Sequence, residues 1–164
     1  MIRVAVITVS DSAIAGTRQD LSGPAVRARA ESLGWTVSVR EMVPDESAQI
    51  ADALRRLADS GEVELILTTG GTGVAVRDVT PEATRGIVQR EIPGLGELMR
   101  FEGLKHTPMA VLSRGLAGVR ASTLIVNLPG SPTGAVESLD AIAKLVPHVL
   151  DLLEGKTSHV DMPN

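Results

Sequence analysis

The chain has 164 residues, a formal net charge of −4 and 43% hydrophobic residues, but only one Trp, one Phe, no Tyr and no Cys. The length and the apolar fraction favour one domain, residues 1–164, over a disordered chain, and the lack of Cys excludes disulfides and Cys-based metal sites. Mild acidity with two aromatic side chains argues against a nucleic-acid partner, which would need a basic surface or a base-stacking platform.

The N-terminal apolar run, residues 2–9, is too short and too rich in β-branched residues for a signal peptide. No apolar stretch reaches the roughly 20 residues that cross a bilayer. We therefore expect a cytoplasmic protein that has no membrane partner.

In the first half of the chain, predicted strands and helices alternate. Residues 2–9 are typical of a strand buried on both faces, and a polar loop, Ser10 to Asp20, follows. Ser22 is predicted to cap the N-terminus of a helix that stops at Gly34. The next predicted elements are a strand over 35–43, a helix that starts at Asp45-Glu46-Ser47 and ends at Gly61, and a strand over 63–68.

The second half continues the alternation. The predicted elements are a helix from Thr80 through about Glu91, a break at Pro93-Gly94, a helix over 95–104, strands over 108–113 and 123–127, a turn at 129–132, and one long amphipathic helix over about 133–153. This order predicts an α/β fold: a single domain of three layers, with a mainly parallel sheet flanked by helices.

Small and polar residues follow four predicted strands. These segments are Ser10-Asp11-Ser12, Pro44-Asp45-Glu46, Thr69 to Asp78, and Pro129 to Thr133. Because open parallel sheets bind ligands outside the carboxyl ends of their strands, we expect the four segments to converge on one site.

The segment Thr69-Gly70-Gly71-Thr72-Gly73 is a candidate phosphate loop. Glycines let backbone N–H groups approach an anion, and Thr hydroxyls add further donors. It is neither a Walker A motif nor Gly-x-Gly-x-x-Gly, because no Gly-Lys-Ser/Thr follows and position 76 is Val. A tight strand-to-helix turn without a ligand remains an alternative interpretation.

Asp45 and Asp78 are candidate Mg²⁺ ligands, because carboxylates at strand ends hold this ion together with water and substrate phosphates. The alternative for Asp45 is that it caps the helix that begins near Ser47. The alternative for Asp78 is that it pairs with Arg77 or caps the helix near Thr80.

Four arginines are candidate contacts for an anionic ligand: Arg77, Arg100, Arg114 and Arg120. Arginine outnumbers lysine 13 to 3 among the 16 basic residues, so the alternative is that they only form a solvated face.

Together these segments resemble the MogA/MoaB family of molybdopterin adenylyltransferases, which is related to the gephyrin G domain. The resemblance covers nearly the whole chain and is carried by Thr68 to Gly73 with Arg77-Asp78-Val79-Thr80-Pro81-Glu82-Ala83-Thr84, and by Asp20-x-Ser22-Gly23-Pro24, Pro44-Asp45-Glu46, Pro93 to Glu97, Leu112-Ser113-Arg114 and Asn127 to Pro132. The intact Arg77 to Pro81 segment is more similar to the MogA branch than to a typical MoaB.

The resemblance implies an enzyme of molybdenum cofactor biosynthesis, a nucleotidyltransferase that moves AMP from Mg-ATP to molybdopterin and releases pyrophosphate. It implies Mg²⁺ as cofactor, a homotrimer, and a downstream molybdenum-insertion enzyme as partner. It assigns catalysis and Mg²⁺ binding to Asp45 and Asp78. It assigns substrate or nucleotide binding to Ser10, Asp11, Thr69, Gly70, Gly71, Thr72, Gly73, Thr80, Glu82, Ser113, Pro129, Gly130, Ser131 and Pro132.

Two alternatives stay open at this point. One is a non-catalytic, MoaB-like oligomer that binds molybdopterin or serves as a scaffold. The other is a nucleotide-binding α/β protein of unrelated chemistry.

Overall fold

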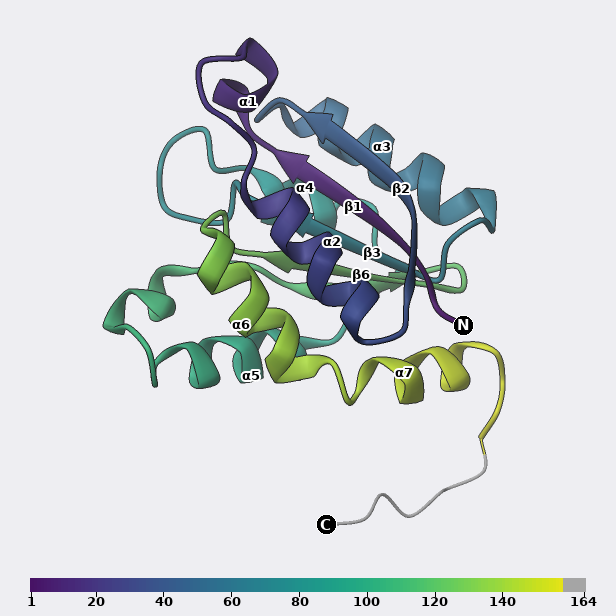
Figure 1. The fold of residues 1–164 in the computed structure, drawn as a ribbon. Helices are drawn as coiled ribbons and strands as arrows, with labels where there is room; N and C mark the ends of the chain where they lie inside the picture. The colour runs from purple at the N-terminus through teal and green to yellow at the C-terminus, as the bar shows by residue number, and fades with distance from the viewer. Residues whose placement is uncertain (158–164) are drawn as a thin grey trace.

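The computed structural model describes residues 1–157, and residues 158–164 lie outside the described part (Figure 1). A six-stranded sheet runs in the order β2-β1-β3-β6-β5-β4. Its strands are β1 (Arg3–Val9), β2 (Thr36–Val43), β3 (Leu65–Thr69), β4 (Arg90–Glu91), β5 (Ala117–Arg120) and β6 (Thr123–Leu128). The first four strands in the sheet order are parallel, and β5 and β4 are antiparallel to their neighbours. The mainly parallel sheet is therefore confirmed.

Helices cover both faces of this sheet. They are α1 (Asp11–Ala15), α2 (Ser22–Ser32), α3 (Ser47–Ser60), α4 (Thr80–Arg85), α5 (Pro93–Gly103), α6 (Pro132–Ile142) and α7 (Val146–Leu153), with a 3-10 helix, η1 (Pro108–Leu112). Apolar side chains of α2, α5, α6 and α7 pack on one face, and those of α3 and α4 pack on the other. Figure 1 shows α2 and α6 in front of the sheet and α3 on its far side. No helix within residues 1–157 is long and apolar enough to span a membrane.

Burial on both faces explains why the central strands were predictable. Along β3 every residue is buried, and successive side chains enter opposite cores: Leu65 and Leu67 contribute to one, Ile66 to the other. The N-terminal run of β1 alternates in the same way. These strands end near one another, so the segments that follow them meet at one edge of the sheet.

Two predicted boundaries in the first half were wrong. The segment after β1 is not all loop, because Asp11–Ala15 forms α1, capped by the Ser10 hydroxyl, which accepts from the Ala13 N–H at 3.1 Å. Ser22 does not cap α2 either. Asp20 does so from upstream, since its Oδ1 accepts from the Gly23 N–H at 3.0 Å.

The helix predicted from Thr80 through Glu91 ends at Arg85 instead. Gly86 and the β-branched pair Ile87-Val88 follow, which have poor helix propensity. The chain then reaches the sheet edge, where the Gln89 N–H donates to the Val119 carbonyl at 2.8 Å and β4 pairs with β5. Strand pairing between β4 and β5 therefore takes the place of the C-terminal part of the predicted helix.

The strand predicted over 108–113 is a 3-10 helix, η1. Pro108 occupies its first turn, and the Thr107 hydroxyl accepts from the Met109 N–H at 3.2 Å, so local capping favours a helical turn. The preceding helix, predicted over 95–104, is α5. It starts at Pro93 because proline suits the first helical position, so Pro93-Gly94 is not a break.

Strand β5 was missed, and the long helix predicted over 133–153 is two helices, α6 and α7. In the interior of a continuous helix the ring of Pro147 would clash with the carbonyl of Ala143, so the chain breaks between Ile142 and Val146. The Leu145 N–H donates to the Ile142 carbonyl at 2.8 Å in the tighter connecting turn.

Candidate functional site

Two neighbouring cavities open at the carboxyl ends of β1, β3 and β6. The first, which we call the acidic cavity, has a volume of about 340 Å³ and contains three carboxylates and one arginine. Its lining residues come from the ends of β1 and β3, from α1 and the segment before α2, from the β2–α3 connection, from the segment before α4 and from the turn after β6: Thr8, Val9, Ser10, Ala13, Arg18, Gln19, Asp20, Leu21, Ser22, Asp45, Thr69, Gly70, Gly71, Asp78, Gly130, Ser131 and Pro132.

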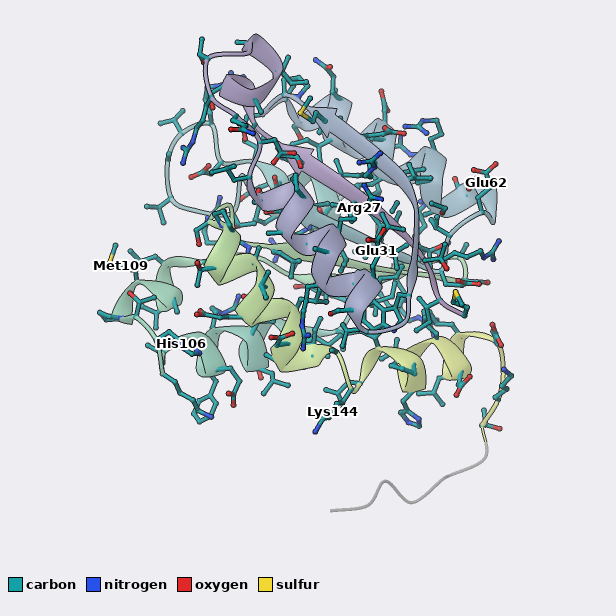
Figure 2. All side chains as sticks on the ribbon, viewed as in Figure 1. Arg27, Glu31, Glu62, His106, Met109 and Lys144 are labelled. Carbon is teal, nitrogen blue, oxygen red and sulfur yellow. The ribbon has the colours of Figure 1, made fainter. Side chains whose placement is uncertain are left out.

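The second cavity, which we call the methionine cavity, measures about 290 Å³ and has a more apolar wall. Its walls come from α5, η1, α6, the end of β6 and the segment Thr69 to Gly73, which we call the glycine loop. The lining residues are Thr72, Gly73, Gly96, Met99, Arg100, Gly103, Thr107, Met109, Ala110, Leu112, Ser113, Gly115, Asn127, Pro129, Gly130, Ser131, Gly134, Glu137 and Ser138. Met109 lies at the outer end of the segment between α5 and β5 (Figure 2). Gly130 and Ser131 line both cavities, so the two share a wall.

The glycine loop needs two of its glycines for steric reasons. Gly70 and Gly71 have φ values of 106° and 68°, which favour glycine. A Cβ on Gly70 would collide with the Val9 carbonyl, and one on Gly71 would collide with the Thr80 hydroxyl. Thr80 in turn donates from its hydroxyl to the Gly70 carbonyl at 3.0 Å, so the loop is held tightly against the start of α4.

Asp45 is bonded to Asp11 by a reciprocal pair of hydrogen bonds. The Asp11 N–H donates to Asp45 Oδ2 at 2.9 Å, and the Asp45 N–H donates to Asp11 Oδ1 at 2.9 Å. Asp45 therefore interacts with the N-terminus of α1, and the cap position of α3 belongs to Glu46, which makes no side-chain cap hydrogen bond. Burial raises the pKa of Asp45, and the charges of Asp11 and Asp78 raise it further.

Asp78 is oriented by its own loop. Its Oδ2 accepts from the Ala75 N–H at 2.9 Å and lies beside Gly73, where a Cβ would be 2.8 Å away. The cap position of α4 belongs to Val79, and the cap makes no side-chain hydrogen bond. Arg77 pairs with Asp11 at 2.6 Å and with Glu46 at 3.1 Å. Helix capping and pairing with Arg77 therefore do not account for Asp78.

All four candidate arginines donate to protein acceptors. Arg77 contacts the two carboxylates just named, and Arg120 binds Asp59 and the Ile87 carbonyl. Arg100 donates to the Gly115 carbonyl at 2.8 Å, and Arg114 binds the glycine loop and Glu82. Of the four, Arg100 alone lines either cavity.

Comparison with known proteins identifies the family. Residues 5–148 match the model described as "probable molybdopterin binding domain". A molybdopterin adenylyltransferase of Helicobacter pylori (strain J99) is 42% identical over 165 residues, which cover 99% of this chain and 94% of the relative. The chain belongs to the molybdopterin-binding domain family. The resemblance predicted from sequence is thus confirmed.

Solved structures agree on the fold of this molybdopterin-binding domain. A crystal structure of the molybdopterin biosynthesis enzyme MoaB from Thermus thermophilus superposes with a TM-score of 0.89 at 54% identity and covers 94% of this chain and 98% of that one. The molybdopterin biosynthesis Mog protein of Mycobacterium ulcerans gives a TM-score of 0.85 at 39% identity, with 93% and 99% covered. Relatives of the domain therefore include both MoaB and Mog proteins.

Most of the predicted site residues of the domain line a cavity. Ser10, Asp45, Thr69, Gly70, Gly71, Asp78 and Pro132 line the acidic cavity, Thr72, Gly73, Ser113 and Pro129 line the methionine cavity, and Gly130 and Ser131 line both. Asp11, Thr80 and Glu82 line neither. Asp11 and Glu82 are paired with Arg77 and Arg114, while Thr80 is fully buried beneath the glycine loop.

Sequence reasoning missed several residues that line the same cavities. Asp20 accepts from the Thr8 hydroxyl at 2.8 Å and forms a wall of the acidic cavity together with Arg18 and Gln19. Asn127, 1% exposed, donates to the hydroxyls of Thr68 and Thr84 at 3.1 and 3.0 Å and lines the methionine cavity. Asp20 and Asn127 both stand within the segments that carry the family resemblance, and this was the one available signal.

The acidic cavity suits a Mg²⁺ ion on electrostatic grounds. Asp45 and Asp78 line it together, and their mutual repulsion contributes to the raised pKa of Asp45, so a bound cation would lower the energy of the charged pair. Within residues 1–157 no three His, Cys, Asp or Glu side chains are grouped to hold a metal alone. The two carboxylates of Asp45 and Asp78 are compatible with Mg²⁺, which is usually bound by one or two carboxylates together with water and substrate phosphates.

Proposed function

We propose that this protein is a molybdopterin adenylyltransferase, which transfers AMP from Mg-ATP to the terminal phosphate of molybdopterin. The observation that carries the proposal is the pair of adjoining cavities. One is polar and carries the Asp45 and Asp78 carboxylates, the other is largely apolar, and they meet at Gly130 and Ser131. Two substrates whose phosphates must come together need this arrangement.

Each cavity suits one substrate. The methionine cavity offers Met99, Met109 and Leu112 to a flat pterin ring, and it does so without aromatic stacking. The acidic cavity lies beside the glycine loop and suits the triphosphate of ATP. Gly130, Ser131 and Pro132 place the N-terminus of α6, an 11-residue helix, at the shared wall, where its positive end favours phosphate.

In the reaction, an oxygen of the molybdopterin phosphate attacks the α-phosphorus of ATP. The new P–O bond forms as the bond between the α-phosphorus and the bridging oxygen to the β-phosphate breaks, and pyrophosphate leaves with that electron pair. Catalysis of this kind depends on in-line positioning and on charge stabilisation. The loop around Gly70 to Gly73 and the end of α6 would orient the phosphates, and no nucleophilic side chain is required.

Asp45 and Asp78 would hold Mg²⁺ in the acidic cavity. When bound, the ion supplies positive charge that neutralises the phosphates and the two carboxylates. Because the overall charge of the chain is −4, its long-range field does not attract anionic substrates, so this local positive charge matters.

Several parts of the proposal depend on family membership alone. These are ATP as the nucleotide, assembly into a homotrimer, a downstream molybdenum-insertion enzyme that accepts the product, and a cytoplasmic location. Size-exclusion chromatography with light scattering measures the oligomeric state directly.

Pyrophosphate release tests the proposal. Purified protein with molybdopterin, ATP and Mg²⁺ should release pyrophosphate, and Asp78→Asn should abolish release while leaving the melting temperature nearly unchanged, since Asn can still accept from the Ala75 N–H. One relative favours a second candidate, because the Thermus structure at 54% identity is a MoaB protein. A molybdopterin-binding protein without turnover would bind the pterin and leave ATP intact.

A further inference from the structure

Arg114 makes an unusually complete set of contacts with the glycine loop. Its Nε donates to the Gly73 carbonyl at 2.7 Å, its Nη2 donates to the Asp78 carbonyl at 2.7 Å, and its Nη1 pairs with Glu82. Its own backbone N–H donates to the Thr72 carbonyl at 2.8 Å. Arg114 therefore donates hydrogen bonds to both ends of the segment 72–78, which includes Asp78.

We propose that Arg114 is a positioning residue for adenylyl transfer, which holds Asp78 and the glycine loop in their reactive arrangement without touching substrate. This inference rests on the proposed function. Arg114 lines neither cavity, and its guanidinium binds the backbone carbonyl oxygens of Gly73 and Asp78. Its neighbours Ser113 and Gly115 do line the methionine cavity, so Arg114 also joins this part of the cavity wall to Thr72 and Gly73, which line the same cavity.

Thr69 to Gly71 are held by α4 and by the turn after β6, but the tip of the segment 72–78 has few other contacts and needs such a clamp. Val74 and Val76 are 72% and 96% exposed, so its tip has almost no apolar packing. The tip is anchored on the α1 side by Arg77, whose partners Asp11 and Glu46 are partly exposed and therefore weakly bound. Arg114 supplies the anchor on the other side. A planar fork can bind two carbonyls and a carboxylate at once, which a lysine ammonium at the same position cannot reproduce.

The clamp also determines the direction of the Asp78 carboxylate. Asp78 Oδ2 accepts from Ala75 N–H, and this bond closes the turn between Gly73 and Asp78, the two residues whose carbonyls Arg114 binds. When the guanidinium is lost, the turn can open and the carboxylate can move relative to Asp45. Misplacement of a reacting group by about 1 Å can cost roughly 100-fold in rate.

Arg114→Lys and Arg114→Met test this inference, with Arg120→Lys as matched control. Arg120 has the same chemistry, because it binds the Asp59 carboxylate and the Ile87 carbonyl, but it lies where β5 turns back into β6, at the opposite end of the sheet from the cavities. If Arg114→Met does not fold, Arg114→Lys keeps the positive charge and the alkyl stem and remains informative.

Two readouts are needed, one of which does not depend on activity. Hydrogen–deuterium exchange of residues 72–79 should speed up in both Arg114 variants and stay unchanged in Arg120→Lys. In the pyrophosphate assay, kcat should fall by about 10- to 100-fold, while KM for molybdopterin and for ATP should change little because Arg114 contacts neither cavity. Arg120→Lys should retain wild-type kcat.

The outcomes separate the two proposals. Unchanged exchange in folded Arg114→Lys, or a wild-type kcat in that variant, overturns the role of Arg114 even when adenylyl transfer is established. A wild-type protein that never releases pyrophosphate overturns the proposed function and the catalytic part of this inference. The exchange data then still decide whether Arg114 clamps the loop.

Discussion

Asp11 and Asp45 each donate a backbone N–H to the carboxylate of the other, at 2.9 Å in both directions. This exchange joins the start of α1 to the β2–α3 connection. It places two carboxylates side by side, and their pKa values shift in opposite directions. Hydrogen bonds from Arg77 and from the Asp45 N–H lower the pKa of Asp11, whereas burial and the charges of Asp11 and Asp78 raise that of Asp45. The charged form of Asp45 is therefore electrostatically unfavourable in the folded protein, whereas that of Asp11 is favoured.

Asp45→Asn should stabilise the metal-free protein at pH 7 and impair its activity. In the folded state the raised pKa of Asp45 means that its charged form is destabilising above that pKa. The variant should melt about 2–4 °C higher, which corresponds to roughly 1 kcal/mol in a domain of this size, and solvent screening of the half-buried group limits the gain. Activity should fall by about 100-fold, as for one preorganised electrostatic group.

The pH dependence supplies the internal control for Asp45→Asn. As the pH falls through the raised pKa, wild-type Asp45 takes up its own proton, so the difference in melting temperature between variant and wild type should vanish. Thermal melts in EDTA at pH 7 and in mild acid measure it. A melting-temperature difference that grows as the pH falls would contradict the conclusion that the charge of Asp45 destabilises the folded protein.

Glu82→Gln should show the opposite pH behaviour. The hydrogen bond from Arg114 lowers the pKa of Glu82, so its stabilisation is fully present above the unfolded-state pKa and is lost as the pH falls through the lower folded-state value. The variant should melt below wild type at pH 7 and approach it in acid. Glu97→Gln, at an exposed position of α5, is the control. An equal fall in melting temperature in that variant would mean that the pair between Arg114 and Glu82 does not stabilise the protein.

The sequence predicted those helices and strands that have a local apolar pattern, but it did not predict those that depend on contacts with distant parts of the chain. Strands β1, β3 and β6 are continuous apolar runs, and helix α3 has apolar residues at helical spacing and ends at Gly61, so local pattern predicted them. Strand β5 has Gly118, which β4 approaches closely, and pairing across the sheet makes it a strand. No local pattern in 117–120 indicates that.

The residues of the candidate site also fall into those that local motifs predict and those that depend on long-range contacts. The glycine loop and the segments that carry Asp45 and Asp78 stand directly after predicted strands, so the rule for parallel sheets predicted that they would converge. Asp20, Asn127 and the clamp by Arg114 depend on contacts between residues far apart in the chain. The break before α7 was missed for another reason: apolar periodicity continues across it, and Pro147 alone marked it.

Gly71→Ala should cost more stability than Gly61→Ala, although both replace a glycine with positive φ, 68° and 72°. A Cβ at Gly61 meets open space, so that variant should lose about 1–2 kcal/mol from the left-handed backbone alone. At Gly71 the Cβ would collide with the Thr80 hydroxyl and lie 3.1 Å from Asp45 Oδ1. Chemical denaturation measures both losses, and equal losses would mean that the loop is not tightly packed against α4.

Transfer of label from ATP tests the central claim most directly. Wild-type protein is incubated with molybdopterin, Mg²⁺ and ATP labelled at either the α- or the γ-phosphate. The adenylyltransferase account predicts that the α-label appears on molybdopterin and the γ-label in pyrophosphate, in equal amounts, and that Asp78→Asn transfers neither. Molybdopterin that is bound but stays unlabelled, or a γ-label that appears as inorganic phosphate, would contradict it.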